Sequence, residues 1–200
     1  MDKNRLEAFS DGVLAIIITI MVLELNLPES DKWKDLLKLT PTLSAYLLSF
    51  FFVAIYWVNH HMTFHDVEQV NLKILWCNIV WLFAMSFIPF ATAWVGLHPV
   101  SWAPLSFYFA DMSLACIAFH LMYYFIFKEN HCGTKFSLGF RSTASLIVYT
   151  GAAILGGFCP LVAYIAVATV SFWWIIPIKT KNEDNNYPSR KSRRKGALNR

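Results

Sequence analysis

The sequence predicts an all-α membrane protein with six transmembrane helices in each subunit, and three observations support this. The composition is 56% hydrophobic and 16% aromatic but only 15% charged, whereas soluble domains contain about a quarter charged residues. The apolar residues gather in long runs, and a helix needs ~20 of them to cross a hydrocarbon core about 30 Å thick. The runs at 43–58 and 74–95 lack the polar faces that buried helices of a soluble protein would show.

The six spans are separated by polar links or by proline and glycine. The first ends before Pro28, and a hydrophilic link at 29–38 follows it. Pro41 suits the first turn of the second helix. Pro160 divides the last two spans, which are short enough that one kinked re-entrant hairpin is the alternative to two full spans. The predicted spans are 6–27, 41–61, 72–94, 105–127, 141–158 and 161–178.

Lysine and arginine set the orientation, because they favour the cytoplasmic side of a membrane. With the N-terminus inside, 14 of the 17 Lys and Arg residues lie on the inner side. We therefore expect both termini in the cytoplasm and a multi-pass protein of the plasma membrane. The segment at 1–178 forms the membrane domain, and the basic tail at 179–200 is expected to be disordered. Basic residues at 190–195 are better explained by contact with membrane lipid than with nucleic acid.

The first span is too short and too acidic for a helix surrounded by lipid. Its uninterrupted apolar stretch at 12–23 is only about 18 Å long at 1.5 Å per residue. Glu7, Asp11 and Glu24 bracket that stretch. Acids within membranes usually face the interior of a bundle or water. We therefore expect other helices or sister subunits to shelter this span.

Helical phase divides the first span into two faces. One face combines a stripe of large apolar residues with Thr19 at its border, and the other carries Asp11. Either both faces pack in a core, or one lines a symmetric pore while the other packs into its own subunit. Stacked apolar rings can close a pore by dewetting it. The stripe is Phe9, Ile16, Ile20, Leu23 and Leu27, and the other face is Asp11, Ala15, Ile18 and Val22.

The start of this span resembles a known family. The pattern Arg5-x-x-x-Phe9-Ser10-Asp11, followed by an apolar run from Gly12, is similar to the first-helix signature of the transmembrane-protein-175 family of potassium channels. Animal members have two six-helix repeats in each chain, and this chain, with one repeat, looks like the prokaryotic members. The motif covers about 16 residues, and the six-span layout covers the whole chain.

The resemblance implies a homotetrameric channel that passes potassium and other monovalent cations, with the first helix of each subunit around a central pore. It assigns the pore constriction to Ile16, Ile20 and Leu23, and a selectivity layer to Thr19. Thr19 is the only hydroxyl within 12–23, although a threonine bonded to a carbonyl one turn back is an equal alternative. No cofactor and no enzymatic activity are implied.

Polar residues of three spans are expected to meet near the inner leaflet. The motif residues Ser10 and Asp11, the end of the second span at His60 or His61, and Asn78 lie at comparable depths. An acid in that setting needs hydrogen-bond donors. We predict a structural lock that joins the first three spans and holds the pore helix. The set assigned to the motif and the lock is Arg5, Phe9, Ser10, Asp11, His60, His61 and Asn78.

Further polar residues lie within or near the predicted spans, namely His61, His65, Asp111 and His120. His61 and His65 have the i, i+4 spacing of a zinc pair, but without a third ligand they predict adventitious metal binding at most. Asp111 is expected near the outer end of its span, bordering water, and His120 in the core with its hydrogen bonds satisfied.

The alternatives to a channel are a secondary transporter and a membrane-embedded scaffold without conduction of its own.

Overall fold

The protein is all-helical in the computed structural model, which describes residues 2–65, 67, 69–130 and 140–175. Four helical segments are long and apolar enough to cross a membrane: Lys3–Leu23, Thr40–His65, Leu72–Leu97 and Trp102–Asn130. The helices are α1 (Lys3–Leu23), α2 (Trp33–Lys38), α3 (Thr40–His65), α4 (Leu72–Met85), α5 (Ile88–Leu97), α6 (Trp102–Asn130), α7 (Phe140–Leu155) and α8 (Pro160–Ile175). The basic tail and part of the sixth predicted span lie outside the described residues.

Several predicted boundaries are wrong. The first helix ends at Leu23 rather than Leu27, and the second continues to His65. Helices α7 and α8 have 16 residues each within the described part of the chain, and α7 begins and α8 ends where that part does.

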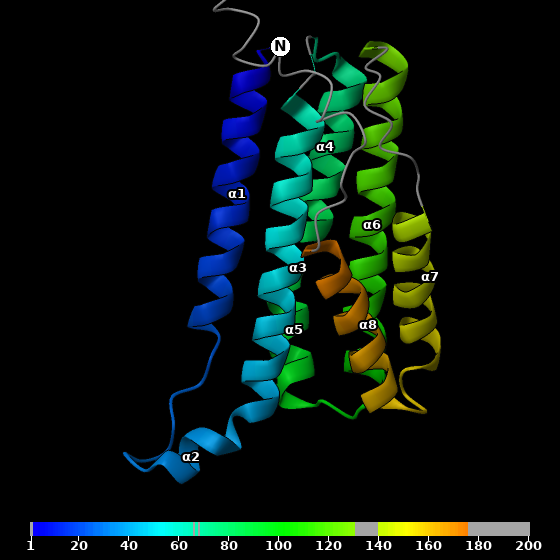
Figure 1. Cartoon of the computed structure of the whole chain (residues 1–200). Helices are drawn as coiled ribbons and strands as arrows, with labels where there is room; N and C mark the ends of the chain where they lie inside the picture. Colours follow the sequence, from blue (N-terminus) through cyan, green and yellow to red (C-terminus); the bar gives the residue numbers. More distant parts are fainter. Residues whose placement is uncertain (1, 66, 68, 131–139, 176–200) are drawn as a thin grey trace, which may run out of the picture.

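The predicted hydrophilic link contains a short helix, α2. Lys38 in its last turn pairs with Asp35 at 2.7 Å and with Glu29 at 3.1 Å. The hydrogen bond from Lys38 lowers the pKa of the Asp35 carboxyl, and the same pair raises the pKa of Lys38. These charges lie at the end of the molecule opposite the labelled N-terminus (Figure 1).

The third predicted span is two helices, because the backbone breaks at Ser86 and Phe87. Pro89 lies in the first turn of α5, and it has no N–H to donate to the carbonyl of Met85 one turn earlier. The Ser86 hydroxyl donates to the Phe83 carbonyl at 2.7 Å and helps to end α4. The prediction of one continuous helix at 72–94 missed this break.

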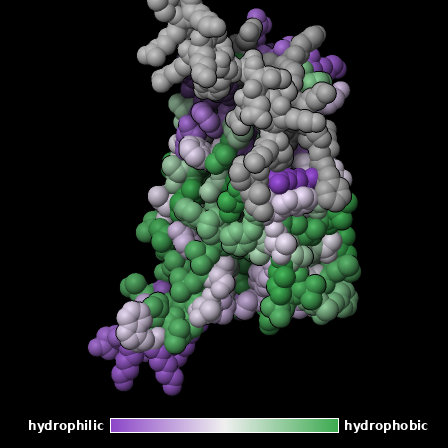
Figure 2. Space-filling model, in the orientation of Figure 1, coloured by the Kyte–Doolittle hydropathy of each residue, from purple (hydrophilic) through white to green (hydrophobic). Residues whose placement is uncertain are grey.

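The helices pack as a bundle with α1 at one edge (Figure 1). Helix α6 packs against α4, α5 and α7, while α1 packs against α3, α4 and α5. The core includes Trp81, Phe52 and Tyr108, all fully buried. Figure 2 shows hydrophobic residues over the middle of the visible face and hydrophilic residues at the α2 end. This distribution is that of a multi-pass membrane protein.

Candidate functional site

The four residues of the predicted stripe that lie on α1 are exposed in the chain, while Leu27 lies beyond the end of the helix. Ile16 is 58% exposed and Leu23 is 80% exposed, and Phe9 and Ile20 are exposed beside them. Core packing within one subunit therefore does not explain the stripe. A large apolar surface of this kind has to be covered by lipid or by another protein surface.

The face of α1 that packs into the bundle is not the face that helical phase suggested. Its buried residues follow the spacing i, i+4, i+8, i+11, i+15 and are Leu6, Ser10, Leu14, Ile17 and Met21. Asp11, Ala15 and Val22, which were expected to share the face opposite the stripe, are exposed. The predicted division into two faces was therefore wrong in its phase, because a second exposed face lies beside the stripe.

Three of the predicted lock residues lie in one buried hydrogen-bond network. The Asn78 amide nitrogen donates to the Ser10 hydroxyl oxygen at 3.0 Å, and the Ser10 hydroxyl donates to the Leu6 carbonyl at 2.9 Å. His60 Nε2 lies 3.0 Å from the Asn78 amide oxygen. Because that oxygen can only accept, Nε2 carries the hydrogen and donates. The network links α1, α3 and α4.

Aromatic rings fix the orientation of the histidine in this network. The His60 ring stacks on Trp81 with a centroid distance of 5.0 Å and an angle of 11°. Phe64 lies on α3 one turn further on, with its centroid 4.6 Å from that of His60. Close packing around His60 leaves its imidazole few alternative rotamers.

The other residues assigned to the lock lie outside the network. Asp11 is exposed, and it accepts a 2.9 Å hydrogen bond from Trp57 Nε1 on α3. Arg5, Phe9 and His61 are also exposed. The expectation that Asp11 meets Asn78 fails because adjacent helical positions point about 100° apart, so Ser10 and Asp11 cannot both face α4. Sequence reasoning missed Trp57 as the partner of Asp11.

Thr19 is exposed next to the stripe, and its hydroxyl donates to the Ile16 carbonyl at 2.8 Å. This is the one-turn-back bond that was the alternative to a selectivity role. The hydroxyl oxygen keeps its lone pairs, so it can still accept a hydrogen bond or contact a cation.

A second polar cluster, which sequence reasoning did not identify, lies behind the C-terminal part of α1. We call it the hydroxyl chain, and it consists of Ser49, Thr92 and Tyr108. Ser49 Oγ lies 2.7 Å from Thr92 Oγ1 and 2.8 Å from the Tyr108 hydroxyl. Thr92 also approaches Met21 Sδ of α1 at 3.9 Å. Isolated hydroxyls inside apolar runs were the signal that could have revealed it.

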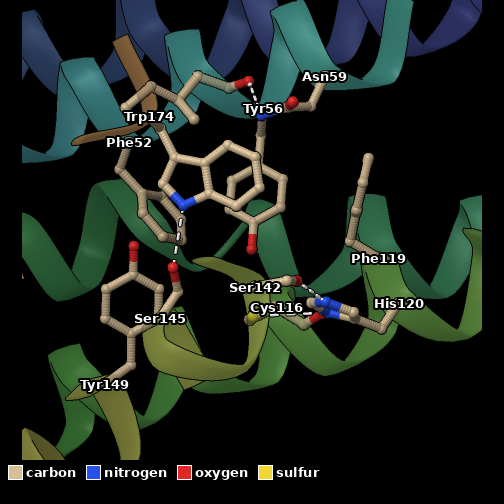
Figure 3. A pocket seen from close by; sticks show the side chains of 11 residues that line it. Phe52, Tyr56, Asn59, Cys116, Phe119, His120, Ser142, Ser145, Tyr149 and Trp174 are labelled. Carbon is tan, nitrogen blue, oxygen red and sulfur yellow. Dashed lines mark hydrogen bonds between the residues drawn. The ribbon is translucent and has the colours of Figure 1, made fainter. Parts of the chain in front are cut away.

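The structure contains a small cavity with no α1 residue in its lining (Figure 3). It has a volume of about 30 Å³ and lies among α3, α6, α7 and α8. Trp174 donates to Ser145 at its edge, and His120 bonds to Ser142 and to the Cys116 carbonyl. The expectation that the hydrogen bonds of His120 are satisfied is confirmed. The cavity is large enough for about two water molecules and too small for an organic substrate.

Two further expectations from the sequence concern metal ligation and the exposure of Asp111. Within the described ranges there is no group of three His, Cys, Asp or Glu side chains that could hold a metal ion. His61 and His65 are both exposed on α3. Asp111 is 6% exposed, so the expectation that it borders water is wrong.

Comparisons with known proteins point to one family. Residues 5–89 match the family described as "Endosomal/lysosomal potassium channel TMEM175". A potassium channel of Chryseobacterium sp. (strain P1-3) is 40% identical over 183 residues, which are 90% of this chain and 95% of that protein. A potassium channel of Streptomyces collinus is 30% identical over 138 residues, 65% of this chain and 67% of that protein.

A solved structure agrees with these sequence matches. It is the crystal structure of a lysosomal potassium-selective channel TMEM175 homolog from Chamaesiphon minutus, with a TM-score of 0.77 and 26% identity. The match covers 86% of this chain and 96% of that one. The fold, the first-helix motif and a bacterial relative matched along nearly the whole chain agree. The chain therefore belongs to the TMEM175 family of ion channels, and it is a bacterial-type member rather than an enzyme.

Proposed function

We propose that the protein is a potassium-permeable cation channel in which four subunits surround a central pore. The observation that supports this most is the exposed apolar stripe of α1 in a chain whose relatives are named potassium channels. Four copies of one stripe around a four-fold axis would cover this surface and enclose a path. One subunit could not enclose a pore with a single helix.

The proposed constriction consists of Ile16, Ile20 and Leu23 from each subunit. Apolar rings exclude water and close a narrow pore by dewetting. Such rings offer no oxygen to replace the hydration shell of an ion, so a preference for potassium needs another group. Thr19 is the proposed group, because it is exposed beside Ile16 and Ile20 and its hydroxyl oxygen can still accept.

The network of Ser10, Asn78 and His60 is proposed to hold the pore helix in place. It ties the inner half of α1 to two other helices, while the stripe stays outside it. Arg5, Phe9 and Asp11 would then act at the surface of α1, where Asp11 already bonds to Trp57 of α3. His61 is proposed to lie at the membrane surface without a resident metal.

The proposed topology has six spans, formed by α1, α3, α4–α5, α6, α7 and α8. Both termini are placed in the cytoplasm and α2 on the outer surface of the plasma membrane, because 14 of 17 Lys and Arg residues then lie inside. Residues 1–178 form the proposed channel domain, and the segment at 179–200 is the proposed basic cytoplasmic tail. The proposed partners are sister subunits, monovalent cations and lipid, with no nucleic acid and no cofactor.

A flux assay tests this proposal. The purified protein is reconstituted in liposomes, a potassium gradient is imposed, and sodium then replaces potassium. A channel gives flux that follows the gradient without coupling to a second solute. Absence of flux would reject the channel.

Two matched substitutions test the constriction in the same liposomes. Ile16→Asn should hydrate the ring and raise conductance or relax selectivity, because a polar amide removes the dewetting barrier. Leu114→Asn is the control, since Leu114 is similarly exposed but lies on α6. Equal effects of the two substitutions would show that Ile16 does not line the pore.

A secondary transporter is the second candidate, and the break between α4 and α5 is the observation in its favour. Discontinuous helices often form substrate sites near the membrane midplane. A transporter would give saturating flux coupled to a second ion in the same assay, whereas a channel would not.

A further inference from the structure

Asp111 has no role in the proposed pore, yet it is an acid closed off within the bundle. It is 6% exposed, and its Oδ2 atom is buried without a hydrogen-bond partner. Among the acids that the structure describes, it is the only one that is buried. An ionised carboxylate is costly in such a place unless a cation or several donors face it.

The position of Asp111 follows from ring contacts between α6 and the α4–α5 pair. Trp81 packs on Phe119 with a centroid distance of 5.5 Å, and Phe90 packs on Phe107 at 5.6 Å. These contacts set an antiparallel register in which Asp111 lies at about the level of Phe87. The acid therefore lies beside the break between α4 and α5.

No cation faces Asp111 from the helices that pack against α6. Helix α5 contains no charged residue, and the charged residue of α4 is Lys73, about 21 Å from Phe87 along the helix. On α7, Arg141 is about 15 Å along the helix from Gly151, which by register with α6 is level with Asp111. Other titratable groups on these helices are Cys116 and His120 of α6, about 8 and 14 Å from Asp111 along the helix, and the phenols of Tyr108, Tyr149 and Tyr164.

The nearest phenol cannot donate to Asp111, because its hydrogen is already used. The Thr92 hydroxyl lies 2.6 Å from the Ile88 carbonyl, which can only accept, so Thr92 donates there. Ser49 must then donate to Thr92, and Tyr108 must donate to Ser49. The hydroxyl chain runs in one direction, from Tyr108 to Ile88. Tyr108 is one turn from Asp111 on α6 but has no hydrogen left for it.

We propose that Asp111 is a proton-binding site in the core of the helical bundle, and that its carboxyl carries a proton at neutral pH while the bundle is folded. The ligand is a proton, because among the residues that the structure describes no helix packed against α6 brings a Lys or Arg side chain level with the carboxyl. The site lies outside the proposed conduction path and does not depend on it.

Infrared difference spectroscopy of the full chain in lipid nanodiscs tests the protonation state directly. The spectrum of the wild type minus that of Asp111→Asn at neutral pH should contain the C=O stretching band of a protonated carboxyl. Glu129→Gln is the matched control, because Glu129 is on the same helix but is partly exposed and paired with Lys73 at 3.4 Å. The spectrum of Glu129→Gln minus that of Asp111→Asn should contain the same band, because Asp111 is unchanged in this control. A wild-type spectrum with no band assignable to Asp111 would overturn the proposal.

A second variant and a change of salt provide further controls for this spectrum. Asp111→Glu retains a carboxyl and should keep the band at a shifted frequency, so the assignment does not depend on the folding of Asp111→Asn. Spectra in sodium chloride are compared with spectra in choline chloride. Loss of the band in sodium would identify a cation site in place of a proton site and would contradict the proposal.

The pH dependence of stability provides an independent measurement. A buried Asp111 that keeps its proton must lose it on unfolding at neutral pH, because an exposed aspartate titrates at about pH 3.9. Unfolding then releases a proton, so a rise in pH above about 4 favours the unfolded state. The thermal midpoint of Asp111→Asn, relative to that of the wild type, should therefore increase as pH rises from 5 to 8. Parallel profiles would show that no proton is held there.

Discussion

At the scale of single residues, the direction of each hydrogen bond determines what a polar side chain can do. Asn78 is the central member of its network, because its amide donates to Ser10 and accepts from His60. Both partners are buried, and a buried polar atom that loses its partner costs more than a hydrogen bond contributes. Asn78 therefore carries more of the stability of α1 than the exposed Asp11 does.

The substitution Asn78→Ala should destabilise the protein by about 1–3 kcal/mol, because it leaves Ser10 and His60 without their shared partner. Thermal unfolding in detergent measures this as a lower midpoint. Asn59→Ala is the control, since the Asn59 amide bonds only to the Ile55 carbonyl of its own helix at 2.8 Å. If both variants unfolded at the same temperature, the network would not be stabilising α1.

At the scale of helices, the α2 end of the bundle depends on how closely α3 and α5 approach. A Cβ atom placed on Gly96 of α5 would lie 3.0 Å from the Cα atom of Thr42 on α3. The Thr42 hydroxyl also donates to the Gly96 carbonyl at 3.2 Å. Glycine at this position lets the two backbones meet, as small residues do between membrane helices.

Gly96→Ala should lower the thermal midpoint, because the added methyl group forces α3 and α5 apart. Overpacking of this kind typically costs about 1–3 kcal/mol. Gly151→Ala in α7 is the matched change, because nothing lies within 4 Å of a Cβ atom there. Its expected effect is neutral or stabilising, since alanine favours a helix more than glycine does. A larger loss in Gly151→Ala would contradict the close approach at Gly96.

At the scale of the whole molecule, α1 is attached to its own subunit by one face and exposes the rest. Its buried face is Leu6, Ser10, Leu14, Ile17 and Met21, while the stripe remains exposed. The proposed assembly resolves this imbalance, because four subunits around an axis give the stripe an interior environment. The hydroxyl chain and Asp111 then lie within each subunit, behind the pore helix.

Native mass spectrometry of the protein released from nanodiscs should give a complex of about four times the 23.0 kDa chain mass. The tetramer is expected because the stripe needs partners that enclose it symmetrically. Cross-linking before release provides an independent count of subunits. A stable monomer or dimer in both measurements would contradict a four-fold pore.

The sequence by itself determined the class of the protein and its family, and it placed Phe9, Ile16, Ile20 and Leu23 on one face of α1. Several apolar runs of about 20 residues without polar faces favour membrane helices over buried soluble ones, and a motif at one spacing is recognised without coordinates. Ser10, His60 and Asn78 were also predicted to lie at one depth, because depth follows from counting residues along antiparallel helices.

Only the tertiary structure decided which polar groups meet. It separated Asp11 from Ser10, joined Ser49, Thr92 and Tyr108 in a chain, and buried Asp111. Depth can be counted along a sequence, but rotation about the helix axis is set by packing against neighbouring helices. A step of one residue turns a side chain by about 100°, so a small error in phase exchanges a buried partner for an exposed one.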